Sequence, residues 1–204
     1  MLMWEFLQVV IHEWTKYPKV EAVEWILKYM GHRLLGIFEA RIYSQNGEDG
    51  IIETIFQKIG TTNQYFVEFG VEDGGECNTR YLRESGWNGL WMDTNYANEY
   101  VKKEFVTPKN IEKRFKKYFV PKEFDLLSID IDGNDYWVWK AIKKYQPRVV
   151  IIEFISKFAV GKNPKWGASL KDIKGLADKK GYKFVCADSR KINAFFVRCD
   201  IIYP

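Results

Sequence analysis

The sequence predicts an α/β domain built on a mainly parallel β-sheet, and three observations support this prediction. From residue 65 onward, short β-rich runs alternate with helical patterns, which is typical of a parallel sheet with helices on both faces. The run VVIIEF at 149–154 is almost continuously apolar and β-branched, as expected of a strand that is buried on both faces. The last two strand-like runs, 182–188 and 193–199, have no helix between them, so they predict an antiparallel hairpin.

Seven segments have the composition of strands. They are 65–70, 89–93, 104–107, 125–132, 149–154, 182–188 and 193–199. Helical patterns cover 51–59, 76–85, 111–119, 134–145 and 169–181. A mainly parallel seven-stranded sheet that ends in an antiparallel hairpin is the arrangement of the Rossmann-like class I methyltransferase fold, whereas ordinary dinucleotide-binding folds usually lack the hairpin. We therefore expect this fold for residues 41–204.

Residues 1–40 are expected to form an N-terminal helical extension. Apolar residues recur there in steps of three and four, as in Val20, Val23, Leu27, Met30 and Leu34, which predicts one apolar stripe along a helix. We favour the interpretation that this stripe covers a hydrophobic edge of the main domain. A homodimer contact or a membrane-surface element is the alternative.

The composition is that of a globular protein, with 47% hydrophobic and 28% charged residues among 204. The net charge of +4 permits a polyanionic partner, but the lysine pairs fall on helical segments and no nucleic-acid-binding signature accompanies them. No apolar run approaches the length of a membrane span, and the first residues lack the features of a signal peptide. We expect no nucleic-acid partner and no membrane span.

Cysteine and histidine are too few and too scattered for several kinds of site. Cys77, Cys186 and Cys199 fit no zinc spacing, and an odd count argues against a disulfide framework, so we expect a cytoplasmic protein. The two histidines, His12 and His32, both lie in the first helical segments. A histidine-based metal site or a Ser-His-Asp triad is therefore not expected.

The ends of the first two strands predict a cofactor site, because ligands of doubly wound sheets bind at the carboxyl ends of the strands. A glycine-containing turn follows the first strand, and Asp93 ends the second about 25 residues later, a separation at which an acid accepts hydrogen bonds from ribose hydroxyls. The turn lacks the phosphate-binding pattern GxGxxG, which favours S-adenosylmethionine (SAM) over NAD because SAM has no pyrophosphate. The residues expected at the cofactor are Glu68, Gly70, Glu72, Asp73, Gly74, Asn78, Asp93 and Asp130.

The ends of two later strands carry acids that are candidates for catalysis. Asp130 and Asp132 follow an apolar strand, and clustered carboxylates are costly there unless they are solvated, paired or bound to a cation. Asn134 and Asp135 better suit a turn into the next helix. Glu153 closes an otherwise apolar strand, where an acid is more often functional than not.

Five motifs of the chain together resemble the FkbM-type methyltransferases. They are SQNGEDGIIETIF, YFVEFGVEDGGECNTRYLRESGWNGLWMD, FDLLSIDIDGNDYWVWKAI, PRVVIIEF and NAFFVRCD, in this order from about residue 43 to residue 200. The resemblance implies a SAM-dependent enzyme that methylates oxygen, often on sugars or glycan-linked products. It implies that the loop after the first strand and Asp93 face SAM, and that Asp130, Asp132 and Glu153 border the site of methyl transfer. The chain departs from the family pattern at Ile155, where an asparagine is common.

From these residues we expect O-methylation of a hydroxylated small molecule or saccharide, with Asp132 as the base, Asp130 as a positioning residue and Glu153 as the fallback base. Asp130 and Asp132 are two positions apart, so in strand geometry they point to the same side and one should have a raised pKa. We expect no tightly held metal, because Ile155 stands where a second strand would supply an oxygen ligand. The alternatives are a non-catalytic interaction protein that keeps this fold, and another enzyme that uses a nucleotide cofactor.

Overall fold

The computed structural model describes residues 38–154 and 167–202. Nearly all of the expected N-terminal extension, and Ile155, lie outside these residues. The strands are β1 (Tyr65–Phe69), β2 (Asn88–Asp93), β3 (Val101–Lys103), β4 (Glu123–Ile129), β5 (Gln146–Glu153), β6 (Tyr182–Ala187) and β7 (Asn193–Arg198). The helices are α4 (Glu48–Ile59), α5 (Arg80–Glu84), α6 (Ile111–Lys117), α7 (Asp135–Ala141), α8 (Leu170–Lys180) and α9 (Cys199–Ile202).

The seven strands form one sheet in the order β3-β2-β1-β4-β5-β7-β6. Adjacent strands from β3 to β5 are parallel, and β7 runs antiparallel to both of its neighbours. The chain proceeds from β1 to one edge of the sheet and returns at β4 to build the other half, so the strand order reverses between β1 and β4. The predicted fold class, a mainly parallel sheet that ends in an antiparallel hairpin, is confirmed. Its switch point is where ligands of such sheets bind.

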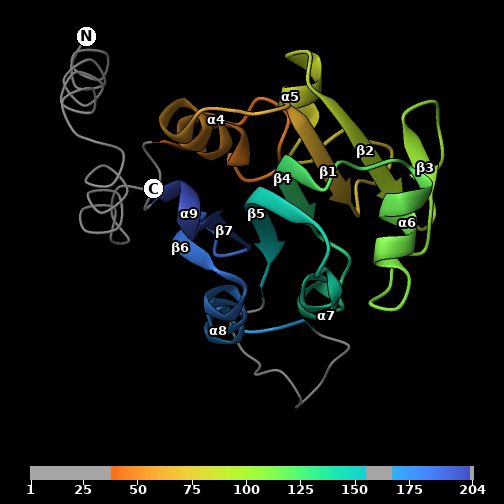
Figure 1. Cartoon of the computed structure of the whole chain (residues 1–204). Coiled ribbons are helices and arrows are strands. Elements are labelled where there is room, and N and C mark those ends of the chain that lie inside the picture. Colours follow the sequence, from red (N-terminus) through yellow and green to blue (C-terminus); the bar gives the residue numbers. More distant parts are fainter. Residues whose placement is uncertain (1–37, 155–166, 203–204) are drawn as a thin grey trace, which may run out of the picture.

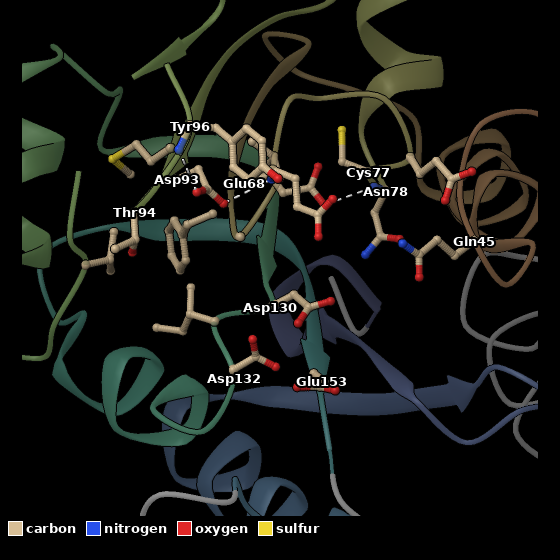
Figure 2. Close-up of a pocket in the computed structure, with 18 of the residues that line it drawn as sticks. Gln45, Glu68, Cys77, Asn78, Asp93, Thr94, Tyr96, Asp130, Asp132 and Glu153 are labelled. Carbon is tan, nitrogen blue, oxygen red and sulfur yellow. Dashed lines mark hydrogen bonds between the residues drawn. The ribbon is translucent and has the colours of Figure 1, made fainter. Parts of the chain in front are cut away.

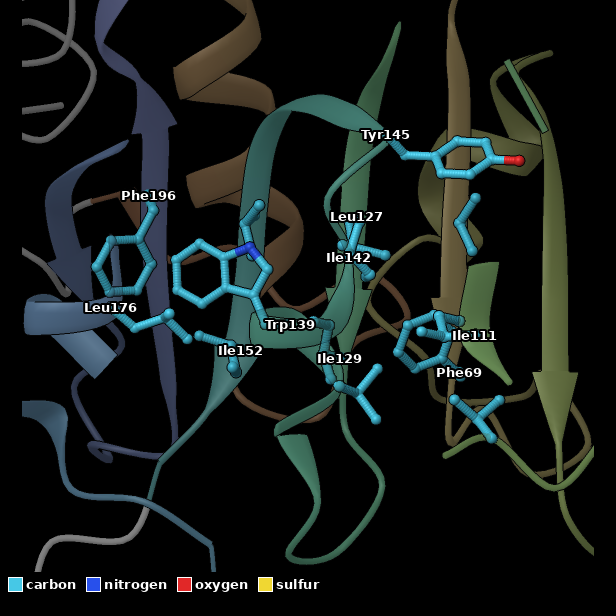
Figure 3. Packing of buried hydrophobic residues seen from close by; sticks show 14 of the residues in the cluster. Phe69, Ile111, Leu127, Ile129, Trp139, Ile142, Tyr145, Ile152, Leu176 and Phe196 are labelled. Carbon is cyan, nitrogen blue, oxygen red and sulfur yellow. The ribbon is translucent and has the colours of Figure 1, made fainter. Parts of the chain in front are cut away.

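Helices cover both faces of the sheet, and the alternation of side chains along the strands builds a separate core on each face (Figure 1). On one face, α6, α7 and α8 pack over Phe69, Leu127, Ile152 and Phe196, and the buried Trp139 of α7 lies among them (Figure 3). On the other face, α4 packs over strand residues that include Phe66, Leu126, Ile151 and Phe195. By the same alternation Glu68, Asp93, Glu153 and Asn193 belong to the α4 face.

Two predicted elements are displaced in the structure. The third strand was expected at 104–107 but lies at Val101–Lys103. Glu104 N still donates to Asp93 O of β2, and the buried Glu104 side chain pairs with Arg114 and Lys117 of α6. The helix expected at 76–85 is confined to Arg80–Glu84, because the backbone N–H groups of Asn78 and Thr79 donate to the Glu68 carboxylate.

The start of α4 carries an acid, Asp49, which suits the positive end of a helix. Asp49 Oδ2 accepts hydrogen bonds from the backbone N–H groups of Ile42, Tyr43 and Ser44, and Ser44 Oγ accepts one from Asp49 N in return. These contacts fix the segment before α4 over the ends of the strands. No helix in the described ranges has the length and apolar character that a membrane crossing requires.

Candidate functional site

A cavity of about 570 Å³ opens at the carboxyl ends of β1, β2, β4 and β5. Segments far apart in the sequence line it: the segment before α4, the loops after β1, β2 and β4, the end of β5 and the hairpin between β6 and β7. Nine of the described side chains that line it are carboxylates, and none is lysine, arginine or histidine. The cavity therefore carries strong negative charge although the whole chain has a net charge of +4.

Gly70 allows the ends of β1 and β4 to approach each other. Its φ is +82°, and a Cβ at this position would lie 1.4 Å from the carbonyl oxygen of Asp130. Gly70 N donates to Met92 O, and Asp130 N donates to Phe69 O. A side chain at position 70 would push Asp130 out of place, so this glycine is required by geometry.

Glu68 holds the loop between β1 and α5 through hydrogen bonds. Its side chain is 2% exposed, and its oxygens accept hydrogen bonds from Asn78 N, Thr79 N, Thr79 Oγ1 and Ser128 Oγ at 2.6 to 3.0 Å. Burial raises the pKa of this carboxyl, and the hydrogen bonds from Thr79, Asn78 and Ser128 oppose that rise. The Glu68 oxygens are thus occupied by protein donors. In this arrangement Glu68 would affect the cofactor only through the loop that it holds.

Asp93 joins the loop after β1 to the loop after β2. Its Oδ2 accepts a hydrogen bond from Glu72 N (3.0 Å), and its Oδ1 accepts from Asn95 N (2.7 Å) and Tyr96 N (3.1 Å). The side chain is 9% exposed and faces the cavity next to Tyr96 (Figure 2). A carboxylate accepts about four hydrogen bonds, so Oδ2 keeps capacity for a ligand hydroxyl.

The other residues expected at the cofactor surround the same loop. Glu72 and Asn78 line the cavity. Asp73 accepts from Gly75 N, Gly74 turns with a φ of +87° against the ring of Trp91, and Asn78 Nδ2 donates to Ser128 Oγ. The structure therefore brings the predicted cofactor residues other than Asp130 to one loop and its supports, although Asp73 and Gly74 do not line the cavity.

Asp130, Asp132 and Glu153 converge on the other side of the cavity, and we call these three residues the carboxylate cluster (Figure 2). One oxygen of each lies within 4.8 Å of the others. Burial, and then the charges of Glu153 and other nearby acids, raise the pKa of Asp130 to about 8. Burial, and then the charges of Asp135 and Asp132, raise the pKa of Glu153 to about 7.

The cluster forms for a different reason than the sequence suggests. β4 ends at Ile129, and Asp132 has a left-handed backbone with a φ of +53°. The expectation that Asp130 and Asp132 share strand geometry is therefore wrong, and a turn brings the two carboxylates together. Asp135 maintains that turn, because its buried carboxylate accepts hydrogen bonds from Ile131 N and Gly133 N. This agrees with the turn-forming role expected for it.

Sequence reasoning missed the part of the cavity wall that Glu48 and Asn193 form. Asn193 pairs with Glu153 across β5 and β7, and its Nδ2 donates to Glu48 Oε1 (2.8 Å). Glu48 Oε1 also accepts from Asn46 Nδ2. Both residues are buried, and both line the cavity. The available signal was an asparagine at the start of an otherwise apolar strand, where a polar side chain needs a partner.

Comparisons with solved structures give methyltransferases of very low identity. A SAM-dependent methyltransferase from Clostridium acetobutylicum is 10% identical, with 84% of this chain and 98% of that chain covered and a TM-score of 0.47. A SAM-dependent methyltransferase from Aquifex aeolicus is 12% identical, with 85% and 97% covered and a TM-score of 0.44. Magnesium protoporphyrin IX methyltransferase from Synechocystis, with bound S-adenosylhomocysteine (SAH), is 9% identical, with 74% and 81% covered and a TM-score of 0.43.

A comparison with curated protein sequences gave no significant match. The family model of the methyltransferase FkbM domain, in contrast, matches residues 38–184, which is well over half of the chain. The matched region contains the loop after β1, Asp93 and the whole carboxylate cluster. It confirms the resemblance that the five sequence motifs indicated. The chain belongs to the FkbM methyltransferase family.

Proposed function

We propose that this protein transfers the methyl group of SAM to a hydroxyl oxygen of a small molecule or saccharide. The observation that carries the proposal is the acidic cavity at the switch point of the sheet, with Asp93 on one side and the carboxylate cluster on the other. SAM is a sulfonium cation, and a cavity lined by carboxylates favours a positively charged ligand. A volume of about 570 Å³ lies within the usual range for small-molecule sites.

The residues of the first half of the cavity fit SAM. Asp93 would accept a hydrogen bond from the ribose, since its Oδ2 has capacity left. The loop from Gly70 to Gly74 would lie along the ligand, and Glu68 would hold that loop through Asn78 and Thr79. When bound, SAM supplies a methyl group that is activated by the positive sulfur.

The carboxylate cluster would accept the proton of the acceptor hydroxyl and position the acceptor. Asp132 is its most exposed member, so it is the one that an acceptor reaches first. We assign to an Asp132 carboxylate oxygen the proton that leaves the hydroxyl during transfer. Asp130, whose pKa of about 8 keeps it protonated at neutral pH, would position the acceptor, and Glu153 is the alternative base.

Residues 1–40 and residues 41–204 are expected to have different roles. We propose that 41–204 form the catalytic domain and that 1–40 pack on this domain or on a second copy of the chain. Glu39 supports a close connection, because its carboxylate accepts hydrogen bonds from Ser189 N and Ser189 Oγ in the β6–β7 hairpin. We further propose that the protein acts in the cytoplasm on a small acceptor and without a nucleic-acid partner.

The proposal is tested by calorimetric titration of the full chain with SAM, SAH, NAD and NADP. We expect SAM and SAH to bind with one site per chain and the two dinucleotides to show no binding. Binding of NAD or NADP in place of SAM would identify another nucleotide-dependent enzyme. Absence of binding to all four would favour a non-catalytic interaction protein that keeps the fold.

A further inference from the structure

Seven of the nine carboxylates that line the cavity fall into two groups. Glu48, Glu68, Asp93 and Glu104 accept hydrogen bonds from protein donors, and Glu104 is also paired with Arg114 and Lys117. The side chains of the carboxylate cluster accept no hydrogen bond from any residue that the structure describes. Asp93 keeps acceptor capacity on Oδ2 alone, whereas all the oxygens of the carboxylate cluster are left for a ligand.

Asn193 adds an oxygen without a hydrogen-bond donor behind this wall. The residue is 2% exposed and lies opposite Glu153 in the pairing of β5 with β7. Its Nδ2 is engaged by Glu48, which leaves Oδ1 buried without a hydrogen-bond partner in the described part of the chain. A buried carbonyl oxygen without a donor leaves its partial negative charge uncompensated beside Glu153, so this part of the wall favours a positively charged ligand.

The wall therefore offers negative charge and hydrogen-bond acceptors. A neutral hydroxyl donates one hydrogen, whereas an ammonium group donates three and carries the opposite charge. Two oxygens that accept from one ammonium at about 2.8 Å, in tetrahedral directions, lie about 4.6 Å apart. One oxygen of each member of the carboxylate cluster lies within 4.8 Å of the others, which is close enough for two of these oxygens to accept from a single ammonium group.

We propose, building on the proposed function, that the methyl acceptor is an amino alcohol, such as an amino sugar, whose protonated amine binds to Asp130 and Glu153. Anionic acceptors such as uronic acids and sugar phosphates should bind more weakly, because the negative charge of the cavity repels them. The protonated amine has no lone pair, so the methyl group goes to the neighbouring hydroxyl oxygen. The new C–O bond forms as the bond between carbon and sulfur breaks, sulfur keeps the electron pair to give SAH, and the hydroxyl proton goes to Asp132.

The test compares three sugars of similar ring structure and different charge. The full chain is saturated with SAH and titrated by calorimetry with glucosamine, glucose and glucuronate. We expect glucosamine to bind at least about tenfold more tightly than glucose, the gain of one charge-assisted hydrogen bond, and glucuronate to bind most weakly. Glu153→Gln should remove the preference for glucosamine. Glu53→Gln, the same change at an exposed position of α4 outside the cavity, should keep it.

The outcomes separate this inference from the function on which it rests. Failure of SAH to bind overturns the proposed function, and the inference falls with it. SAH binding without a preference for glucosamine, including no detectable binding of any of the three sugars, overturns the inference alone. Stoichiometric binding of Mn²⁺ that is lost in Glu153→Gln would show that the carboxylate cluster is a metal site, and this too would overturn the amine assignment.

Discussion

Glu153 ends β5 beside Asp130, which follows the neighbouring strand β4, and one carboxylate oxygen of each lies within 4.8 Å of the other. The charge of Glu153 contributes to the raised pKa of Asp130, after the larger effect of burial. Two such groups cannot both ionise freely at neutral pH. The fold thus holds acids where they destabilise one another, which is typical of a functional site rather than of a structural one.

The first prediction is that Asp130 makes the fold less stable as the pH rises. Its pKa is about 8 in the folded chain, above its ordinary value of 3.8, so the folded state binds the proton more tightly than the unfolded state does. The stabilisation is complete below about pH 4 and is lost as the pH rises through about 8. Asp130→Asn should therefore raise the melting temperature at pH 8 by at least about 2 °C and have a smaller effect at pH 5.5.

Thermal unfolding at several pH values, followed by circular dichroism, checks this. Glu53→Gln is the matched control, because that exposed acid of α4 lies outside the cavity and should leave the pH dependence unchanged. If Asp130→Asn lowers the melting temperature at pH 8, the ionised Asp130 carboxylate does not destabilise the folded state as we infer.

The second prediction concerns Glu68 as the support of the loop between β1 and α5. Glu68→Ala removes the acceptor for Asn78 N and Thr79 N and should destabilise the fold by about 2–3 kcal/mol. Glu68→Gln keeps one oxygen and should cost less. Hydrogen exchange at the amides of Asn78 and Thr79 is the specific readout, and it should accelerate most in Glu68→Ala. Unchanged exchange at these two amides would contradict the assigned role.

The third prediction is that Asp132 accepts the proton of the acceptor. Asp132→Asn keeps the shape of the side chain and removes its basicity, so SAH affinity should stay the same while methyl transfer slows by roughly a hundredfold or more. The measurement is SAH formation from SAM with a hydroxylated acceptor, alongside calorimetry with SAH. A near-wild-type rate would move the base to Glu153, and a defect confined to SAH affinity would remove Asp132 from the chemistry.

The fourth prediction is that methyl transfer does not require a divalent cation. Glu153 supplies the second-strand oxygen that the sequence did not indicate at residue 155, so three carboxylates do meet. A proton on Asp130 near neutral pH and the amine of the proposed acceptor both reduce the negative charge of this group, however, so methyl transfer needs no metal cation there. After exhaustive chelation, SAH formation should continue at the same rate. Lost activity that magnesium or manganese restores would contradict this.

The sequence predicts the sheet well because its signals are local. The apolar run of β5 and the helix-free connection between β6 and β7 give the topology, and Asp93 can be placed because it ends a strand. The start of α5 could not be predicted, because the side chain of Glu68 competes for the amides that would begin the helix earlier. That competition depends on a contact between residues about ten positions apart in the sequence, and a periodic pattern of apolar residues does not reveal such a contact.

The candidate site was only partly predictable for a related reason. The spacing of Asp130 and Asp132 indicated two nearby carboxylates on one strand. In the structure a turn with a positive φ at Asp132, rather than strand geometry, brings the two carboxylates together. The contact of Asn193 with Glu48 joins residues 145 positions apart in the chain. Only the folded sheet places such a pair in the same wall, so sequence patterns could not assign it to the cavity.

The affinity of the wild-type chain and of Asp93→Ala for SAM, measured by calorimetry, tests the central claim most directly. The account predicts that the wild-type chain binds SAM and that Asp93→Ala weakens binding by about 1.5–3 kcal/mol, the range for hydrogen bonds to a charged group. Asp93→Asn, which keeps one oxygen at the end of β2, should lose less. If the wild-type chain does not bind SAM, or if Asp93→Ala binds it with unchanged affinity, SAM does not occupy this cavity in the way that we propose.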